Sequence, residues 1–216
     1  VVPNEEVNHK PVLHAPFMLR EGFVTSLWNV TKGKSITEME RPIDVGVFWT
    51  HGDFSHYGFY RRQTTEVVKT MHHSKVTDKR VVENQIQVAY SDEKGMEAGN
   101  IQQEYVEQLL SCKIVLVTQR DEWEDHFRLM ESLASGAMVV TDIMLAMPLG
   151  FKDGVNIVVY RDPRDLKDKL RHYIKHEDER RKIARKGYEM VMSRHRCWHR
   201  LEDLLFGRPL THVDRP

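Results

Sequence analysis

Residues 125–142 read DHFRLMESLASGAMVVTD, and this stretch decides the fold. Its first half places apolar side chains at helical spacing, at Phe127, Met130, Leu133 and Ala134. Gly136 stands where the end of a helix favours a residue of positive φ. Residues 137–140 then form a short apolar run, which is typical of a buried strand. The stretch therefore predicts a helix that passes through a glycine turn into a strand covered on both faces.

The alternation of strand and helix continues on both sides of this stretch. Short apolar runs predict strands at residues 43–49, 85–90, 114–117, 137–140 and 157–160. Helical stripes lie between or after them, at residues 64–71, 105–110, 127–134 and 166–174. Asp162 and Pro163 form an N-cap and a first-turn proline for the last of these helices. Such alternation predicts parallel βαβ units, and we expect a Rossmann-like three-layer α/β/α sandwich.

The length of 216 residues suits one main domain. We place it at residues 42–207, where the strand and helix pattern begins and ends. Residues 1–41 are rich in proline, asparagine and charge, and we expect an irregular N-terminal extension or an inter-domain connection there. Residues 208–216 are expected to be a tail.

Charge and apolar content exclude several classes of function. Lys plus Arg balance Asp plus Glu at 32 each, so no basic field favours a nucleic-acid partner. The longest apolar runs fall short of the roughly 18 residues of a membrane span, and the first residues have no signal-peptide layout. With only Cys112 and Cys197 a disulfide framework is not expected. We therefore expect a cytoplasmic protein without a membrane span in this chain, and the initial Val allows for a piece of something longer.

Polar residues follow the predicted strands at their carboxyl ends. They are Thr50-His51-Gly52, Tyr90-Ser91, Thr118-Gln119-Arg120 and Thr141-Asp142. In open parallel sheets the ligand crevice lies beyond this edge, so a polar ligand is expected there. The sequence lacks the glycine fingerprints of dinucleotide-binding and P-loop proteins and the nucleophile elbow of hydrolases, which disfavours those three classes.

The segment from Tyr105 to Leu205 resembles the C-terminal, donor-binding domain of group 1 glycosyltransferases, which have the two-Rossmann-domain GT-B fold. The resemblance is strongest to the branch related to bacterial spore-maturation proteins. The matching pieces follow in the family's order: YVEQLLSCKIVLVTQRD, HFRLMESLASGAMVVTD, GVNIVVYRDPRDLKDKL and ERRKIARKGYEMVMSRHRCWHRLEDLL.

The resemblance implies one half of a sugar-transferring enzyme. The substrate would be a nucleoside-diphosphate sugar, and the acceptor a hydroxyl group of a glycan or other molecule. Neither a cofactor nor a metal ion is expected. Since the family places acceptor binding on an N-terminal Rossmann domain, the resemblance also implies such a domain, or a dimer partner.

The family's site residues can be carried over by position. Glu131 matches the glutamate that accepts hydrogen bonds from the ribose hydroxyls. Arg128 and His126 begin the same helix and are the candidates for catalysis, because they would hold the diphosphate as it leaves. Other candidates for binding the nucleotide sugar are Phe127, Arg120, Arg61, Arg62, Thr118, Tyr90, Ser91, Thr50, His51 and Gly52.

One position departs from the family pattern and leaves alternatives open. Many members carry a second glutamate eight residues before the first, but Trp123 stands there in this chain. A module that binds nucleotide sugars without catalysis, or serves as a scaffold, is therefore the first alternative. A phosphosugar isomerase or epimerase of the same layered architecture is another, and it would need His51 and Glu131 to face each other. His195, Cys197 and His199 suggest a zinc site only weakly, because Cys197 points away from the two histidines on a helix.

Overall fold

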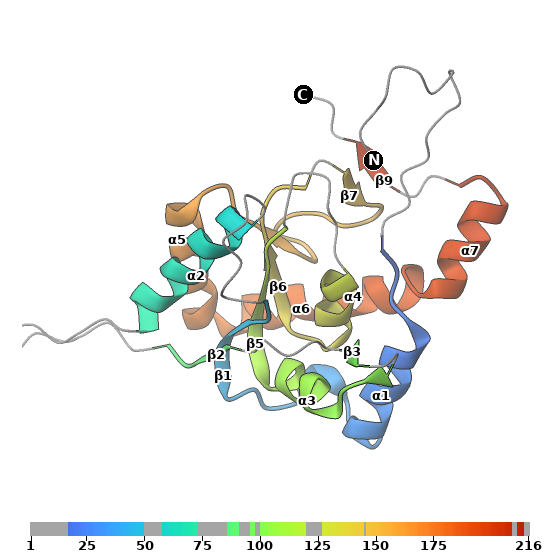
Figure 1. Cartoon of the computed structure of the whole chain (residues 1–216), viewed down its shortest axis with the longest axis horizontal. Coiled ribbons are helices and arrows are strands. Elements are labelled where there is room, and N and C mark those ends of the chain that lie inside the picture. The colour runs from blue at the N-terminus through green and yellow to red at the C-terminus, as the bar shows by residue number, and fades with distance from the viewer. Residues whose placement is uncertain are drawn as a thin grey trace, which may run out of the picture.

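The computed structural model contains a five-stranded parallel sheet between two layers of helices (Figure 1). It describes residues 17–49, 58–72, 86–90, 96–97, 100–119, 127–144, 146–208 and 211–213. The strand order is β2-β1-β5-β6-β8, and neighbouring strands all pair in parallel. The bounds of the strands are Ile43–Val47 for β1, Val88–Tyr90 for β2, Cys112–Val117 for β5, Met138–Thr141 for β6 and Val158–Val159 for β8.

Helices cover both faces of the sheet, which confirms the predicted α/β sandwich. In Figure 1, α2 (Phe59–His72) and α5 (Pro163–Lys175) lie on one face. α3 (Gln103–Ser111) and α4 (Phe127–Ala134) lie on the other face, with α1 (Glu21–Thr31) packed outside α3. α6 (Glu177–Arg194) contacts both α4 and α5. The strands have apolar side chains on both faces because each face lies under a helical layer.

Side chains of β5 show how the two layers share the core. Val115 and Val117 point into the core beneath α1, α3 and α4, whereas Ile114 and Leu116 point into the core beneath α2 and α5. All four are 3% exposed or less. Continuous burial of this kind is why the strand has no polar alternation.

The helix boundaries follow local signals in the sequence. Oδ1 of Asp162 accepts from the backbone N–H groups of Arg164 and Asp165, so α5 begins with the predicted N-cap and Pro163. After α4, Gly136 has a φ of +75° and its N–H donates to the Leu133 carbonyl. This sharp turn lets β6 begin directly after α4.

The chain before residue 42 differs from the expected irregular extension. Its described part contains α1 and a 3₁₀ turn at Ile36–Glu38, and Phe23 and Leu27 of α1 are fully buried. Leu19 also pairs with the far end of the fold: its N–H donates to the His195 carbonyl, and its carbonyl accepts from the Cys197 N–H. The helix was not expected because the segment is polar overall. Its apolar side chains stand four residues apart, as in an amphipathic helix. The proposed boundary at residue 42 stays a prediction.

Arg41 joins this N-terminal segment to the amino edge of the sheet. Its guanidinium donates to five backbone carbonyls, those of Ile36, Leu109, Leu110, Cys112 and Ser135. Four of these carbonyls lie where α3 passes into β5 or just past the end of α4, and the fifth, that of Ile36, lies in the 3₁₀ turn. A single side chain thus ties the segment to two βα units.

Smaller elements complete the described part. They are the antiparallel pair of β3 (Met96–Glu97) with β4 (Asn100–Ile101), the antiparallel pair of β7 (Ala146–Pro148) with β9 (Thr211–Val213), and α7 (Cys197–Leu205). α7 extends away from the sheet beside α1 (Figure 1). Among the residues that the structure describes, every helix is too short or too polar to span a lipid bilayer.

Candidate functional site

Two of the predicted arginines reach the carboxyl edge of the sheet from opposite sides. Nε of Arg61, on α2, donates to the carbonyl of Thr118, 3.1 Å away, just past the end of β5. Nη1 of Arg128, on α4, donates to the carbonyl of Phe48, just past the end of β1. Because β1 and β5 are neighbours in the sheet, the two guanidinium groups bracket adjacent strand ends. This edge is where open parallel sheets bind their ligands.

A buried hydroxyl network extends from the same edge. The Thr118 hydroxyl lies 3.2 Å from that of Thr64 and 3.0 Å from that of Tyr160, and the Thr64 and Tyr160 oxygens are 2.9 Å apart. Burial raises the pKa of Tyr160, so it stays protonated and can donate. The network fixes the ends of β5 and β8 against α2.

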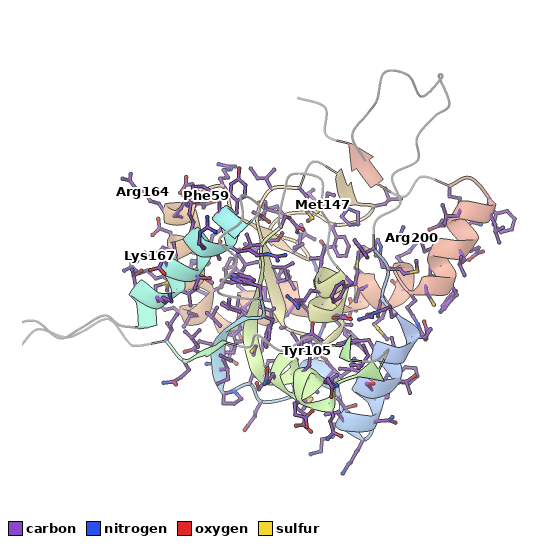
Figure 2. All side chains as sticks on the ribbon, viewed as in Figure 1. Phe59, Tyr105, Met147, Arg164, Lys167 and Arg200 are labelled. Carbon is purple, nitrogen blue, oxygen red and sulfur yellow. The ribbon has the colours of Figure 1, made fainter. Side chains whose placement is uncertain are left out.

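A pocket of about 460 Å³ opens beside this network, between the first turns of α2 and α5. Figure 2 labels Phe59 and Arg164 at this end of the molecule. The pocket lies within the range of small-molecule sites, about 300–1,000 Å³. Its walls combine apolar surface, from Ile143, Pro163 and Leu166 among others, with the polar groups of Gln63, Thr64, Asp142, Tyr160 and Asp162.

Asp142 gives this pocket an ionisable group. Both carboxylate oxygens accept from the backbone N–H of Gln119, at 3.0 and 3.2 Å. Burial raises the pKa of Asp142 to about 6, and the nearby charge of Arg61 opposes the shift. The carboxylate is therefore an oriented hydrogen-bond acceptor near neutral pH.

Glu131 lies on the opposite face of the sheet and is only 1% exposed. Its Oε1 accepts from Nη2 of Arg20 at 2.5 Å, and its Oε2 accepts from the hydroxyl of Tyr105 at 2.8 Å. Burial raises the pKa of Glu131, while Arg20 acts in the opposite direction. The carboxylate predicted to receive ribose hydroxyls thus has a protein donor on each oxygen.

Phe127 lies between two guanidinium groups at the start of α4. The guanidinium carbon of Arg20 is 5.0 Å from the centre of the Phe127 ring, and that of Arg128 is 5.8 Å from it. Both distances fall within the usual range of cation–π contact. Arg20 and Arg128 thus share this ring, and hydrogen bonds join Glu131 and Tyr105 to Arg20 in the same cluster.

The structure thus brings the described site candidates together in two groups. Arg61 and Thr118 adjoin the pocket, whereas Phe127, Arg128 and Glu131 form the cluster on the α4 side. Arg62 is half-buried on α2. Tyr90 ends β2, but its side chain is outside the described residues. Thr50, His51, Gly52, Ser91, Arg120 and His126 also lie outside the described residues.

Sequence reasoning missed three side chains of these groups, and it placed a fourth, Asp142, at the carboxyl edge without carrying it over as a site candidate. Tyr105 was assigned to an apolar helix face and Tyr160 to a strand, because an aromatic ring at such spacing is most often core. Arg20 lies in a segment without regular periodicity, and its partner Glu131 is 111 positions away. Asp142 alone had a signal, since it follows a strand at the carboxyl edge.

Comparison with known families shows to which protein family this chain belongs. A family model described as glycosyl transferase-like matches residues 61–205, about two thirds of the chain. The chain belongs to the glycosyl transferase-like family. The match begins at Arg61 and contains Thr118, Arg128, Glu131 and Asp142, whereas Arg20 lies before the matched region. No curated protein matches the sequence.

Several solved structures share the fold of this chain. The C-terminal domain of a group 1 family glycosyl transferase (LpcC) from Francisella tularensis has a TM-score of 0.51 and 16% identity, over 79% of this chain and 92% of that one. Anabaena Alr3699/HepE, solved with UDP and glucose, has a TM-score of 0.51 and 10% identity, over 85% and 52%. Sucrose-phosphate synthase from Thermosynechococcus elongatus has a TM-score of 0.50 and 12% identity, over 89% and 52%. The chain spans about half the length of the last two.

Proposed function

We propose that this chain binds a nucleoside-diphosphate sugar and serves as the donor half of a glycosyltransferase. The observation that carries the proposal is the pair of Arg61 and Arg128 at neighbouring strand ends within the matched family region, with a pocket on the Arg61 side of the sheet. Two guanidinium groups suit a diphosphate, because each can donate two parallel N–H groups to its oxygens.

The proposed reaction transfers the sugar from the diphosphate to an acceptor hydroxyl. The bond between the anomeric carbon and the diphosphate oxygen breaks, and its electron pair leaves with the diphosphate. The acceptor oxygen bonds to the anomeric carbon, and its proton passes to a base. The arginines stabilise the negative charge that develops on the leaving diphosphate. Since this chain's own cations perform that task, we propose that the reaction needs no metal ion.

The acceptor side is proposed to come from an N-terminal domain. The chain spans about half the length of HepE and of sucrose-phosphate synthase, so a partner of comparable size fits the same fold. α7 and the residue after it also expose apolar side chains, including Trp198, Leu201, Leu205 and Phe206, with Leu205 83% exposed. An exposed apolar cluster of this kind is typical of an interface. Membership of the spore-maturation branch and a cytoplasmic location stay predictions.

A calorimetric titration tests the donor site. The chain is titrated with UDP, GDP, ADP and their sugars, first without metal ions and then with magnesium. We expect one diphosphate to bind selectively, with equal affinity in both buffers. Arg61→Ala and Arg128→Ala are each expected to weaken it about tenfold or more, because a charge-assisted hydrogen bond is worth about 1.5–3 kcal/mol.

Arg185→Ala is the matched control, since Arg185 lies on α6 in an exposed ion pair with Glu38 and should leave binding unchanged. Thermal unfolding of each variant shows whether it remains folded. Failure of all the diphosphates to bind would refute the proposal. Binding that strictly requires magnesium would refute metal independence. Binding without slow hydrolysis or transfer of the sugar would favour the alternative of an inactive binding module.

A further inference from the structure

We propose that this chain has a second ligand site, at the amino edge of the sheet, which binds the phosphate group of a small phosphorylated molecule or free phosphate itself. The site is a basic pocket between α6, the start of β5 and residues 37–42. It lies at the opposite edge of the sheet from Arg61 and Arg128. The inference therefore does not rest on the proposed function.

The pocket has the size of a small-molecule site. Its volume is about 510 Å³, within the usual range of about 300–1,000 Å³. One wall is the first half of α6, and another is the chain that leads from the 3₁₀ turn into β1. Of the three acidic residues in the first turn of α6, only Glu177 lines the pocket. The cations of the lining are Arg41, Lys113, Arg180, Arg181 and Arg185.

Two of these cations are neutralised by carboxylates outside the pocket. Nζ of Lys113 lies 2.6 Å from Oδ1 of Asp44. Arg185 forms an ion pair with Glu38, in which both side chains are more than half exposed. Exposed pairs of this kind contribute little to an electrostatic field, so Arg185 is not counted as part of the phosphate site.

The other three cations share one carboxylate inside the pocket. Glu177 accepts from Nε of Arg181 at 2.7 Å, whereas Nη2 of Arg180 lies 3.7 Å from it, too far for a hydrogen bond. Glu40 also lines the pocket, but it is exposed and forms no ion pair within the described part of the chain. With Arg41, three arginines stand against the single carboxylate of Glu177.

Burial makes this surplus of positive charge unfavourable. Arg180 is only 4% exposed, and its Nη1 donates to the Tyr173 carbonyl at a long 3.3 Å. Burial lowers the pKa of Arg180, and the charge of Arg181 acts in the same direction. Burial also lowers the pKa of Arg41 to about 10, again with the charges of Arg181 and Arg180 adding to the effect. An anion in the pocket would relieve this repulsion.

The donors that a phosphate group needs are present. Nε of Arg181 holds Glu177, while its Nη1 and Nη2 have no protein partner among the described residues. Two N–H groups of one guanidinium fit two oxygens of a phosphate. Arg41 contributes charge rather than donors, because both of its Nη atoms already donate to backbone carbonyls. Three arginines against one carboxylate match a dianion better than a carboxylate ligand.

Calorimetric titration in a phosphate-free buffer tests the site with three probes: inorganic phosphate, glycerol 3-phosphate and fructose 6-phosphate. Glycerol and fructose are the neutral counterparts. We expect the phosphate-bearing probes to bind, the neutral ones not to bind, and the affinity to fall as salt is added. Esters that bind more tightly than inorganic phosphate would identify a phosphate ester as the ligand, and the reverse order would identify free phosphate.

Two variants change the charge of the pocket in opposite directions. Arg181→Met should weaken the tightest probe about tenfold, because it removes charge-assisted hydrogen bonds. Glu40→Gln should strengthen the same probe about threefold, because it removes a negative charge from the lining, and damage to the fold would not have this effect. Arg194→Met is the matched control, since it removes an exposed positive charge from the other end of α6 and should leave the affinity unchanged.

Arg61→Ala separates this pocket from the donor edge. The phosphate probes should bind equally to the wild type and to Arg61→Ala, and they should shift the backbone amide NMR signals of residues 37–41 and 177–185. Loss of phosphate binding in Arg61→Ala would assign the phosphate to the donor edge and overturn the inference. Failure of all three probes to bind, or binding that Arg181→Met leaves intact, would also overturn it. Because these titrations use no nucleotide, their outcome is independent of the proposed donor site.

Discussion

Arg200 and His195 form a buried pair in which Nη2 of Arg200 donates to Nδ1 of His195 at 3.0 Å. Nε2 of the histidine donates to the Leu149 carbonyl, and its ring stacks on Phe151. Both ring nitrogens are therefore engaged, and Nδ1 can accept only in the neutral form. Arg200 is 1% exposed at the first turns of α7 (Figure 2), so the pair fixes α7 to the end of α6.

This arrangement predicts acid sensitivity. Burial, followed by the charge of Arg200, lowers the pKa of His195 to about 4. Between pH 6.5 and 4 the unfolded chain binds a proton that the folded chain does not, so stability falls as the pH falls. The advantage of the wild type over His195→Gln should shrink by about 3 kcal/mol across this window, because each pKa unit is worth about 1.4 kcal/mol. Urea denaturation at pH 7 and pH 4.5 measures it, and a constant difference would contradict it.

Asp142 should act with the opposite sign. Its pKa is raised to about 6, so between about pH 4 and 6 the folded chain binds a proton that the unfolded chain lacks. Stability from this group is present below pH 4 and is lost as the pH rises through 6. The free energy of unfolding of the wild type relative to Asp142→Asn should therefore increase as the pH falls from 7 to 4. A carbon-detected NMR titration of the carboxyl group checks the pKa directly, and a midpoint near 4 would refute it.

Two glycines in helices should respond differently to the same substitution. A Cβ on Gly187 of α6 would lie 2.6 Å from the carbonyl oxygen of Asn156 and 2.8 Å from Cδ2 of Leu133, whereas a Cβ on Gly22 of α1 would have nothing within 4 Å. Alanine is favoured over glycine in a helix by about 1 kcal/mol. Gly22→Ala should gain up to that amount, and Gly187→Ala should lose about 1–3 kcal/mol through overpacking. Thermal unfolding compares the two variants. Equal changes in melting temperature would show that α6 does not pack closely against Asn156 and Leu133 at Gly187.

Arg41 should be far more important to stability than an exposed arginine. Arg41→Met removes the hydrogen bonds that the guanidinium donates to five backbone carbonyls, and we expect a loss of about 3 kcal/mol or more. Arg185→Ala breaks only an exposed ion pair with Glu38 and should cost less than about 1 kcal/mol. Chemical denaturation of both variants tests the contrast. A loss below 1 kcal/mol for Arg41→Met would mean that water satisfies those carbonyls.

The sheet and its helices were predictable because local patterns agree with the tertiary structure. The apolar runs form β1, β5 and β6. Gly136 follows the end of α4, and Asp162 caps the start of α5, as their conformational preferences predict. The helix α1 was not predicted, because its surroundings are rich in charge and turn-forming residues. What determines α1 is its packing on α3, and contacts between such distant segments leave no local periodicity.

The site was only partly predictable for the same reason. Positions after strands identified Thr118 and Asp142 with the carboxyl edge, since the topology of a parallel sheet alone places them there, whereas Arg61 came from the family resemblance. The partners of Glu131 could not be predicted, because Arg20 comes from a distant segment and Tyr105 has the spacing of a core residue. A resemblance to a family supplies the position of a residue but not the neighbours that occupy its hydrogen bonds.

The backbone pairing of Leu19 with His195 and Cys197 has a mechanical consequence. These two hydrogen bonds join the first described residues to the last helices, outside the parallel sheet. A force that separates residues 19 and 196 therefore acts on these two hydrogen bonds, here called the clasp, before it acts on the sheet. Under such a pull the fold should open first at the clasp and peel away α1, and the βα units should give way only at a higher force.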